Sequence, residues 1–154
     1  MRWVSQEIDM YIKSKEYVDT AIMLLLPVSF ENDMKQTASM SEFISLLGLQ
    51  IERQFRGRVL MLPSHSYLKS LAADKLVSDV RVWEENLFVE GFKNIFYLTS
   101  DSFWRSYEDQ LEGSLIWLPS LPLEHIDEST RNSILDDQVK QLVSLFLQKW
   151  QKKD

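Results

Sequence analysis

The sequence contains no cysteine. A disulfide framework, a zinc site built on thiolates and a cysteine nucleophile are therefore all excluded. The absence of cysteine is compatible with a reducing compartment, so we expect a cytoplasmic protein. The N-terminus also lacks the apolar core of a signal peptide, which agrees with that expectation.

Glycine is scarce as well, with four residues in the whole chain. Neither the GxGxxG pattern of dinucleotide-binding proteins nor the phosphate-binding P-loop occurs, because both need clustered glycines. The nucleophile elbow GxSxG and the zinc-protease motif HExxH are missing too. The sequence thus holds no recognised catalytic motif, and we expect no cofactor and no bound metal.

Long apolar runs and basic clusters are also missing. The longest purely apolar run, residues 21–28, includes a proline, whereas a membrane-spanning helix needs about twenty apolar residues. The formal net charge is −6, and a nucleic-acid binder needs a basic surface to bind phosphates. We therefore expect no integral membrane association and no nucleic-acid partner.

Aromatic residues, in contrast, are plentiful, with eight Phe, five Tyr and five Trp. Together they supply enough apolar surface for a core, which argues against disorder. The length of 154 residues is typical of one α/β domain, so we expect residues 1–154 to form a single domain. Aromatic side chains beyond the needs of a small core often anchor partners, which indicates an interaction surface.

Short apolar runs and amphipathic segments alternate along the chain. The continuous apolar character of the runs indicates strands covered on both faces, as in a parallel sheet between helices. The alternation predicts an α/β fold, a three-layer α-β-α sandwich around a mostly parallel sheet of about four strands. The strand order stays open, and the short last connection allows an antiparallel edge for the fourth strand. The expected strands are 21–26, 59–62, 94–98 and 114–118, and the expected helices are about 5–17, 39–55, 67–90, 102–111 and 128–152.

Several residues mark helix ends and faces. Gly91 followed by Phe92 predicts a helix C-terminus with its hydrophobic contact, and Gly113 is the expected stop of the short helix. The stripe that ends in Phe146 and Trp150 predicts a last helix packed on the core. The acidic pair at positions 84–85 is typical of a solvated helix face.

The predicted strands end in similar sequences. Proline cannot donate to a sheet, so it suits the point where a strand leaves it, and serine caps the following turn. On the functional interpretation, all four endings lie at the carboxyl edge of a parallel sheet, where α/β proteins usually bind ligands. Both interpretations stay open. The endings are Leu26-Pro27-Val28-Ser29, Leu62-Pro63-Ser64-His65, Leu98-Thr99-Ser100-Asp101 and Leu118-Pro119-Ser120.

The functional interpretation predicts a ligand site made of the polar residues at these ends. His65 is its most versatile member, because an imidazole can act as a general base or hold an anion. A Ser–His–Asp hydrolase is disfavoured, because nothing in the pattern activates a nucleophile. The structural alternative is a loop histidine that caps the following helix. The candidate ligand-binding residues are Ser29, Ser64, His65, Ser66, Thr99, Ser100 and Asp101.

Two further segments contain residues that could bind an anion or a metal ion. Trp104 and Arg105 follow the third strand and could hold a planar anion, although packing of the tryptophan on the sheet is the simpler interpretation. His125 has acidic neighbours, but their spacing is no established metal-ligand pattern. A solvated segment before the last helix is the interpretation we favour there.

The N-terminal part also carries a family resemblance. The segments Met1-Arg2-Trp3, Lys15-Glu16-Tyr17-Val18-Asp19-Thr20-Ala21 and Leu25-Leu26-Pro27-Val28-Ser29-Phe30 resemble the YpiF-like proteins, uncharacterised small proteins of spore-forming Gram-positive bacteria. The likeness runs the length of the chain in size and in order of segments. It implies a bacterial cytoplasmic protein of unknown function and assigns no activity, cofactor or catalytic residue.

Two functional hypotheses follow from these observations. The first is a non-catalytic cytoplasmic protein-interaction or regulatory module, with another protein or a second copy as its partner. The second is a small-ligand-binding protein or enzyme with a site around His65, Ser100 and Asp101. The first is favoured because no catalytic motif is present, but fold alone does not decide function.

Overall fold

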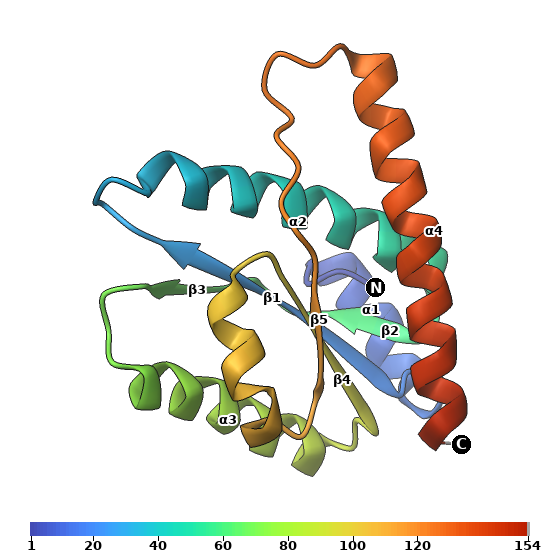
Figure 1. Cartoon of the computed structure of the whole chain (residues 1–154). Coiled ribbons are helices and arrows are strands. Elements are labelled where there is room, and N and C mark those ends of the chain that lie inside the picture. The colour runs from blue at the N-terminus through green and yellow to red at the C-terminus, as the bar shows by residue number, and fades with distance from the viewer. Residues whose placement is uncertain (154) are drawn as a thin grey trace.

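A parallel β-sheet lies between two layers of helices in the computed structural model, which describes residues 1–153 (Figure 1). This arrangement confirms the predicted three-layer α/β fold. The strands are β1 (Thr20–Val28), β2 (Val59–Met61), β3 (His65–Leu68), β4 (Asn94–Thr99) and β5 (Ser114–Trp117). The helices are α1 (Ser5–Lys13), α2 (Met34–Gln54), α3 (Ala73–Glu90) and α4 (Glu128–Lys153), with 3-10 turns η1 (Lys15–Tyr17) and η2 (Ser102–Gln110).

The strand order is β2-β1-β4-β5, and β3 pairs with β1 on the same side as β2. Each of these pairs is parallel, including the last, so β5 is not an antiparallel edge. After β1, the chain adds β2 and β3 on one side of that strand. It then returns past β1 and adds β4 and β5 on the other side. This is a doubly wound order, and its topological switch point lies between β1 and β4.

A β-bulge separates β2 from β3. Met61 pairs with Ile22 and His65 pairs with Leu25, so the edge strand uses one residue more than β1 over the same stretch. A shift of one residue turns every following side chain to the opposite face. Tyr67 therefore joins the core on the α3 side of the sheet.

The bulge corrects two sequence predictions. The edge strand was expected to end at Leu62, followed by a helix from about Tyr67, but pairing with β1 resumes at His65 and α3 begins at Ala73. His65 is therefore a strand residue and not a helix cap. Pro63 does interrupt the strand, but β1 continues and offers a partner beyond the interruption.

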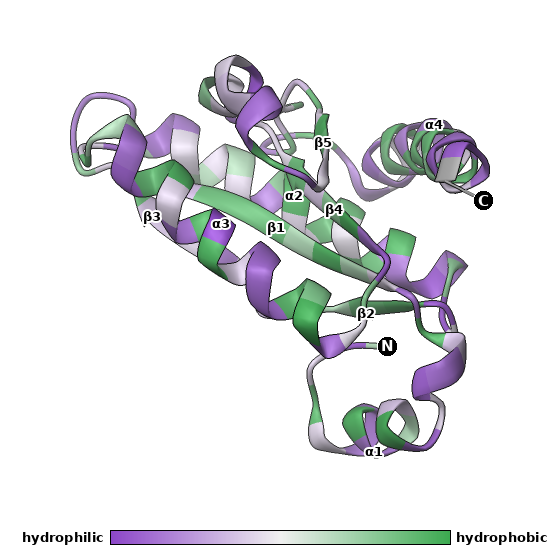
Figure 2. Ribbon diagram, turned by 90° about the horizontal axis from the view of Figure 1, so that it is seen from below, coloured by the Kyte–Doolittle hydropathy of each residue, from purple (hydrophilic) through white to green (hydrophobic). Residues whose placement is uncertain are grey.

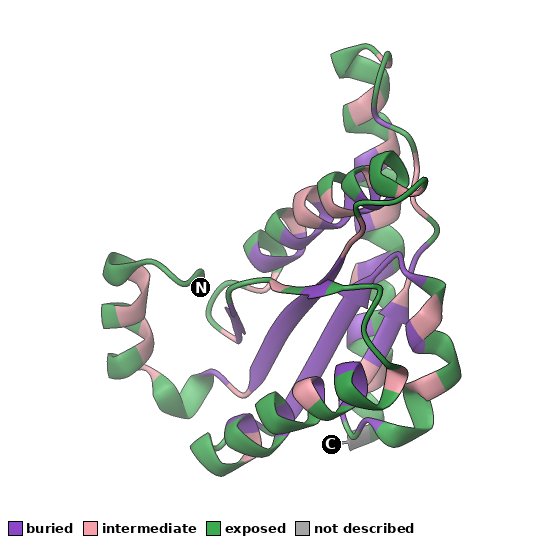
Figure 3. Cartoon of the chain, turned by 90° about the vertical axis from the view of Figure 1, so that its left-hand side faces the viewer, coloured by how far each residue is buried: buried purple, intermediate pink, exposed green. Residues whose placement is uncertain are grey.

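Each face of the sheet packs on its own apolar core. Ile22, Leu24 and Leu26 of β1 face α2 and α4, whereas the residues between them face α3 and η2. Figure 3 shows the central strands buried and the outward helix surfaces exposed. Phe146 and Trp150 of α4 are 0% and 2% exposed, which confirms the predicted packing of the last helix. None of the helices within residues 1–153 has the length and apolar character of a membrane span.

Several element ends differ from the sequence predictions. The first helix ends at Lys13 and is followed by η1, α2 begins already at Met34, and the segment after β4 is a 3-10 helix. Figure 2 shows α1 at the periphery, apart from the sheet. The end of α3 is as predicted: Gly91 has a φ of 115°, and the Phe92 N–H donates to the Leu87 carbonyl at 3.1 Å.

The amino edge of the sheet is closed by paired charges. Glu52 is fully buried, and its carboxylate lies 3.0 Å from the Met1 ammonium and 3.1 Å from Arg56 Nε. Burial alone would raise the pKa of Glu52, but hydrogen bonds from Arg56 and Met1 outweigh burial and hold this pKa below its ordinary value. Near it, Asp19 binds Arg58 at 3.1 Å.

A second buried carboxylate holds the loop before β5. Glu84 is 4% exposed, so the expected solvated face is wrong at this position. Its carboxylate accepts the Gly113 N–H at 2.7 Å and the Glu112 N–H at 3.3 Å. A Cβ on Gly113 would lie 2.6 Å from the Tyr97 ring, so only glycine lets the loop approach this closely.

Candidate functional site

Doubly wound sheets usually bind ligands at the topological switch point, which here lies between β1 and β4. Segments that leave these two strands pass to opposite faces, α2 to one and η2 to the other, which usually opens a crevice at the carboxyl ends. Here the crevice is almost closed, and a cavity of about 60 Å³, lined in part by Tyr67, Asp101 and Phe103, lies beside it. Thr99 Oγ1 donates to the Leu25 carbonyl at 3.0 Å and accepts the Asp101 N–H at 3.1 Å.

A buried polar cluster fills the space below this closure. The Tyr67 hydroxyl donates to Asp101 Oδ2 at 2.6 Å and accepts the Trp104 Nε1–H at 2.8 Å. Asp101 is 4% exposed and Trp104 is fully buried, so the predicted packing of this tryptophan is confirmed. Burial raises the pKa of Tyr67, and the Asp101 carboxylate raises it further. The cluster is closed on itself, as a structural network is.

His65 touches this cluster from the side. Its ring lies 6.2 Å from the Tyr67 ring, centre to centre, and is nearly parallel to it. Burial lowers the pKa of His65, and the Asp79 carboxylate opposes that shift only in part. The imidazole is therefore neutral near pH 7, and the contact with the closed cluster is through Tyr67.

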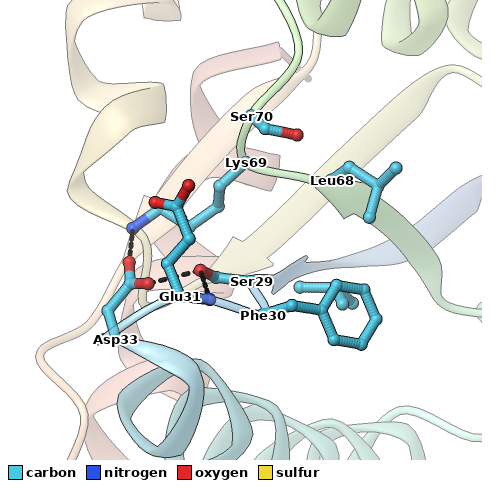
Figure 4. A pocket seen from close by; sticks show the side chains of 8 residues that line it. Ser29, Phe30, Glu31, Asp33, Leu68, Lys69 and Ser70 are labelled. Carbon is cyan, nitrogen blue, oxygen red and sulfur yellow. Dashed lines mark hydrogen bonds and ion pairs between the residues drawn. The ribbon is translucent and has the colours of Figure 1, made fainter.

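A hollow of about 510 Å³ lies further out, at the tip formed by β1 and β3 (Figure 4). Its polar wall is a chain of contacts: the Ser29 hydroxyl donates to Asp33, and Lys69 Nζ lies 3.1 Å from the other carboxylate oxygen. These contacts, that with Ser29 foremost, hold the pKa of Asp33 below its ordinary value. We call this space the tip hollow; it is lined by Val28, Ser29, Phe30, Glu31, Asp33, Leu68, Lys69 and Ser70.

Exposed apolar side chains surround the tip hollow. Phe30 is 75% exposed and Leu68 is 44% exposed, although both are large and apolar. Met34, which is 53% exposed, and Phe30 also line a neighbouring hollow of about 200 Å³ at the start of α2. Exposed apolar groups in such a cluster mark interaction sites more often than singly scattered ones do.

The structure separates the six predicted site residues other than His65 into three groups. Ser29 lines the tip hollow, as the functional interpretation expects. Ser64 and Ser66 are exposed, and neither hydroxyl has a hydrogen bond within the described chain. Thr99, Ser100 and Asp101 are buried under the closed crevice, and the Ser100 hydroxyl has no hydrogen-bond partner among residues 1–153.

Sequence reasoning missed Phe30, Asp33, Leu68 and Lys69. One signal for Phe30 was available, because an aromatic residue in the turn that follows a strand has no helix or strand to bury it. Asp33 and Lys69 are far apart in the sequence, so their ion pair had no sequence signal. Within residues 1–153, no three carboxylate or imidazole side chains gather as metal ligands would.

The sheet order and the hollow at its carboxyl edge define a doubly wound α/β protein with a candidate binding site. Residues 9–150 match a family described as "Protein of unknown function (DUF2487)", and the chain belongs to this family. It is 36% identical over 150 residues to the "Uncharacterized protein YpiF" of Bacillus subtilis (strain 168), an alignment that covers 97% of this chain and 98% of that protein. The resemblance found in the sequence is thus confirmed. No solved structure matches the chain.

Proposed function

We propose that this chain is a cytoplasmic, non-catalytic interaction module that binds a segment of a partner protein at the tip hollow. The observation that carries the proposal is Phe30, which lies two residues after the end of β1 and is 75% exposed beside a hollow. Covering a phenylalanine side chain contributes about 1.5–3 kcal/mol. That is the size of a hot-spot contribution in a protein interface.

The polar groups of the tip hollow support binding and not catalysis. The Ser29 hydroxyl donates to Asp33, and Asp33 is also held by Lys69. A catalytic serine instead needs a base that accepts its proton and a third group that orients the base. His65, the nearest histidine in sequence, is not among the residues that line the tip hollow.

Photocrosslinking from position 30 tests the proposal. A photoreactive phenylalanine analogue replaces Phe30 in one variant and Val89 in a control, since Val89 is 89% exposed on α3. We expect one protein to be crosslinked from position 30 and not from position 89. The additional change Leu68→Asp should abolish the crosslink, because it puts a charge into the apolar side of the hollow. Equal crosslinking from both positions, or no effect of Leu68→Asp, would contradict the proposal.

The volume of the tip hollow supports a second candidate function. About 510 Å³ falls within the range of about 300–1,000 Å³ that small-molecule sites occupy. If the chain instead binds a small molecule, native mass spectra of gently purified protein will show an excess mass of that size. The variant Lys69→Ala should then lose this mass, because it opens the polar wall of the hollow.

A further inference from the structure

The tip hollow has two chemically different sides. Figure 4 shows the side chains of Phe30 and Leu68 on one side of the hollow and those of Ser29, Asp33 and Lys69 on the other. Glu31 follows Phe30 in sequence, but its side chain points away from the phenylalanine ring and towards the polar side. A ligand that fills the hollow therefore meets apolar and charged groups at once.

The charges of the polar side do not cancel. Lys69 Nζ lies 3.1 Å from Asp33 Oδ2, so these two charges compensate each other. The Glu31 carboxylate is exposed and forms no ion pair within residues 1–153. Its backbone N–H is fixed by the Ser29 hydroxyl at 3.2 Å, which holds the residue at the hollow. One negative charge is thus left at the site.

We propose, building on the interaction function above, that the partner segment carries an apolar side chain directly next to a lysine or arginine. The apolar side chain lies against Phe30 and Leu68, and the cation pairs with Glu31. Neighbouring side chains of an extended segment point to opposite sides, which matches a hollow with an apolar side and a charged side. An acidic segment would instead place like charges together, which disfavours binding.

Two synthetic peptides test this inference. The first is the acetylated and amidated hexapeptide Ser-Leu-Arg-Leu-Arg-Ser, and the second has glutamate in place of both arginines. Amide NMR signals of the full chain are followed during titration with each. We expect the cationic peptide to shift signals of residues 28–33 and 68–70, and the acidic one to leave them in place.

A matched pair of variants locates the charge that matters. Glu31→Gln should weaken the cationic peptide about twofold to fivefold, the range of an exposed ion pair. Glu16→Gln, which removes another exposed carboxylate at the other end of the molecule, should leave the affinity unchanged. Raising the salt concentration should reduce the difference between wild type and Glu31→Gln, because the pair is screened.

Three results would overturn the inference. The first is that the cationic peptide shifts no signal of the tip hollow at millimolar concentration. The second is that the acidic peptide binds as tightly as the cationic one. The third is that Glu16→Gln weakens binding as much as Glu31→Gln, which would mean a diffuse attraction to the acidic chain. The crosslink from position 30 is independent of peptide charge, so its presence alongside any of these results leaves the interaction function intact.

Discussion

The amino edge of the sheet and the tip formed by β1 and β3 use charged side chains in opposite ways. At the amino edge, the carboxylates of Glu52 and Glu84 are buried, and each is bound by at least one group that is distant in the chain. At the carboxyl tip, the Glu31 carboxylate is exposed without an ion pair among residues 1–153, beside the exposed ring of Phe30. The charges at the amino edge stabilise the fold, whereas the tip leaves a charge and apolar surface available to another molecule.

The position of Glu52 sharpens this contrast. It lies near the end of α2, where the helix dipole disfavours a negative charge, and it is also fully buried. Two cationic groups offset both costs, at 3.0 Å and 3.1 Å. The Glu52 carboxylate joins α2 to the Met1 ammonium, which in turn donates to the Val59 carbonyl of β2. We therefore expect changes at the amino edge to affect stability, and changes at the tip to affect binding.

The largest effect should come from Glu52→Gln. Removing the buried carboxylate leaves the buried Met1 ammonium uncompensated, which costs about 3–5 kcal/mol. The free energy of unfolding, measured with urea, should fall by about that amount. Glu42→Gln, an exposed change on the same helix, should stay within about 0.5 kcal/mol of wild type. A loss at Glu52 no larger than at Glu42 would remove the proposed difference between the two ends.

The pH dependence of this loss is a second prediction. The folded-state pKa of Glu52 lies below its ordinary value of 4.5, so its ionised form stabilises the fold above that pH. This contribution should disappear as the pH falls through 4.5 towards the lower folded-state pKa. The stability difference between wild type and Glu52→Gln should therefore shrink on acidification. A difference that stays constant from pH 7 down to pH 3 would show that the carboxylate charge contributes nothing.

A smaller effect is expected from Tyr67→Phe, below the closed crevice. The hydroxyl donates to Asp101 and accepts from Trp104, so its loss leaves two buried polar groups without this partner. The cost should be about 2–3 kcal/mol in the free energy of unfolding. Tyr17→Phe changes a residue that is 70% exposed and should cost less than about 0.5 kcal/mol. A wild-type stability for Tyr67→Phe would mean that the cluster does not support the fold.

The smallest effect on stability should come from Phe30→Ala. Because Phe30 is 75% exposed, its truncation should change the free energy of unfolding by no more than about 0.5 kcal/mol. Binding of the partner segment should nevertheless weaken at least tenfold, as at an interface hot spot. Val89→Ala, the matched exposed change on α3, should alter neither quantity. A clear loss of stability in Phe30→Ala would show that this ring serves the fold.

Most of the fold follows from the sequence because apolar runs report burial directly. Runs such as 21–26 and 94–98 lie inside β1 and β4, and the Gly91-Phe92 pair ends α3 as predicted. The bulge could not be predicted from the sequence. A proline such as Pro63 is expected both where a strand ends and where its pairing register shifts by one residue. The buried state of Glu84 was hidden as well, since its partners Glu112 and Gly113 are distant in the sequence. The spacing of Glu52 and Arg56 is a helical one, but the contact of Glu52 with Met1 had no sequence signal.

The candidate site was predictable only in part, for a reason of strand length. Ser29, Thr99 and Asp101 all follow predicted strands, but β1 extends past the last residue that it pairs with β4. The end of β1 therefore reaches the surface, whereas the end of β4 stays buried beside it. A sequence shows where a strand ends, but it does not show how far its neighbour continues.

The bulge between β2 and β3 has a consequence for how this family can vary. Before the bulge, odd-numbered residues of the edge strand face the α2 side of the sheet. After the bulge, odd-numbered residues such as Tyr67 face the α3 side. A relative that loses a single residue at positions 62–64 would turn the tyrosine of β3 out of its core. Length changes here should therefore occur in twos, or together with a one-position move of the aromatic residue. A comparison of the number of residues between β2 and β3 among family members would test this expectation.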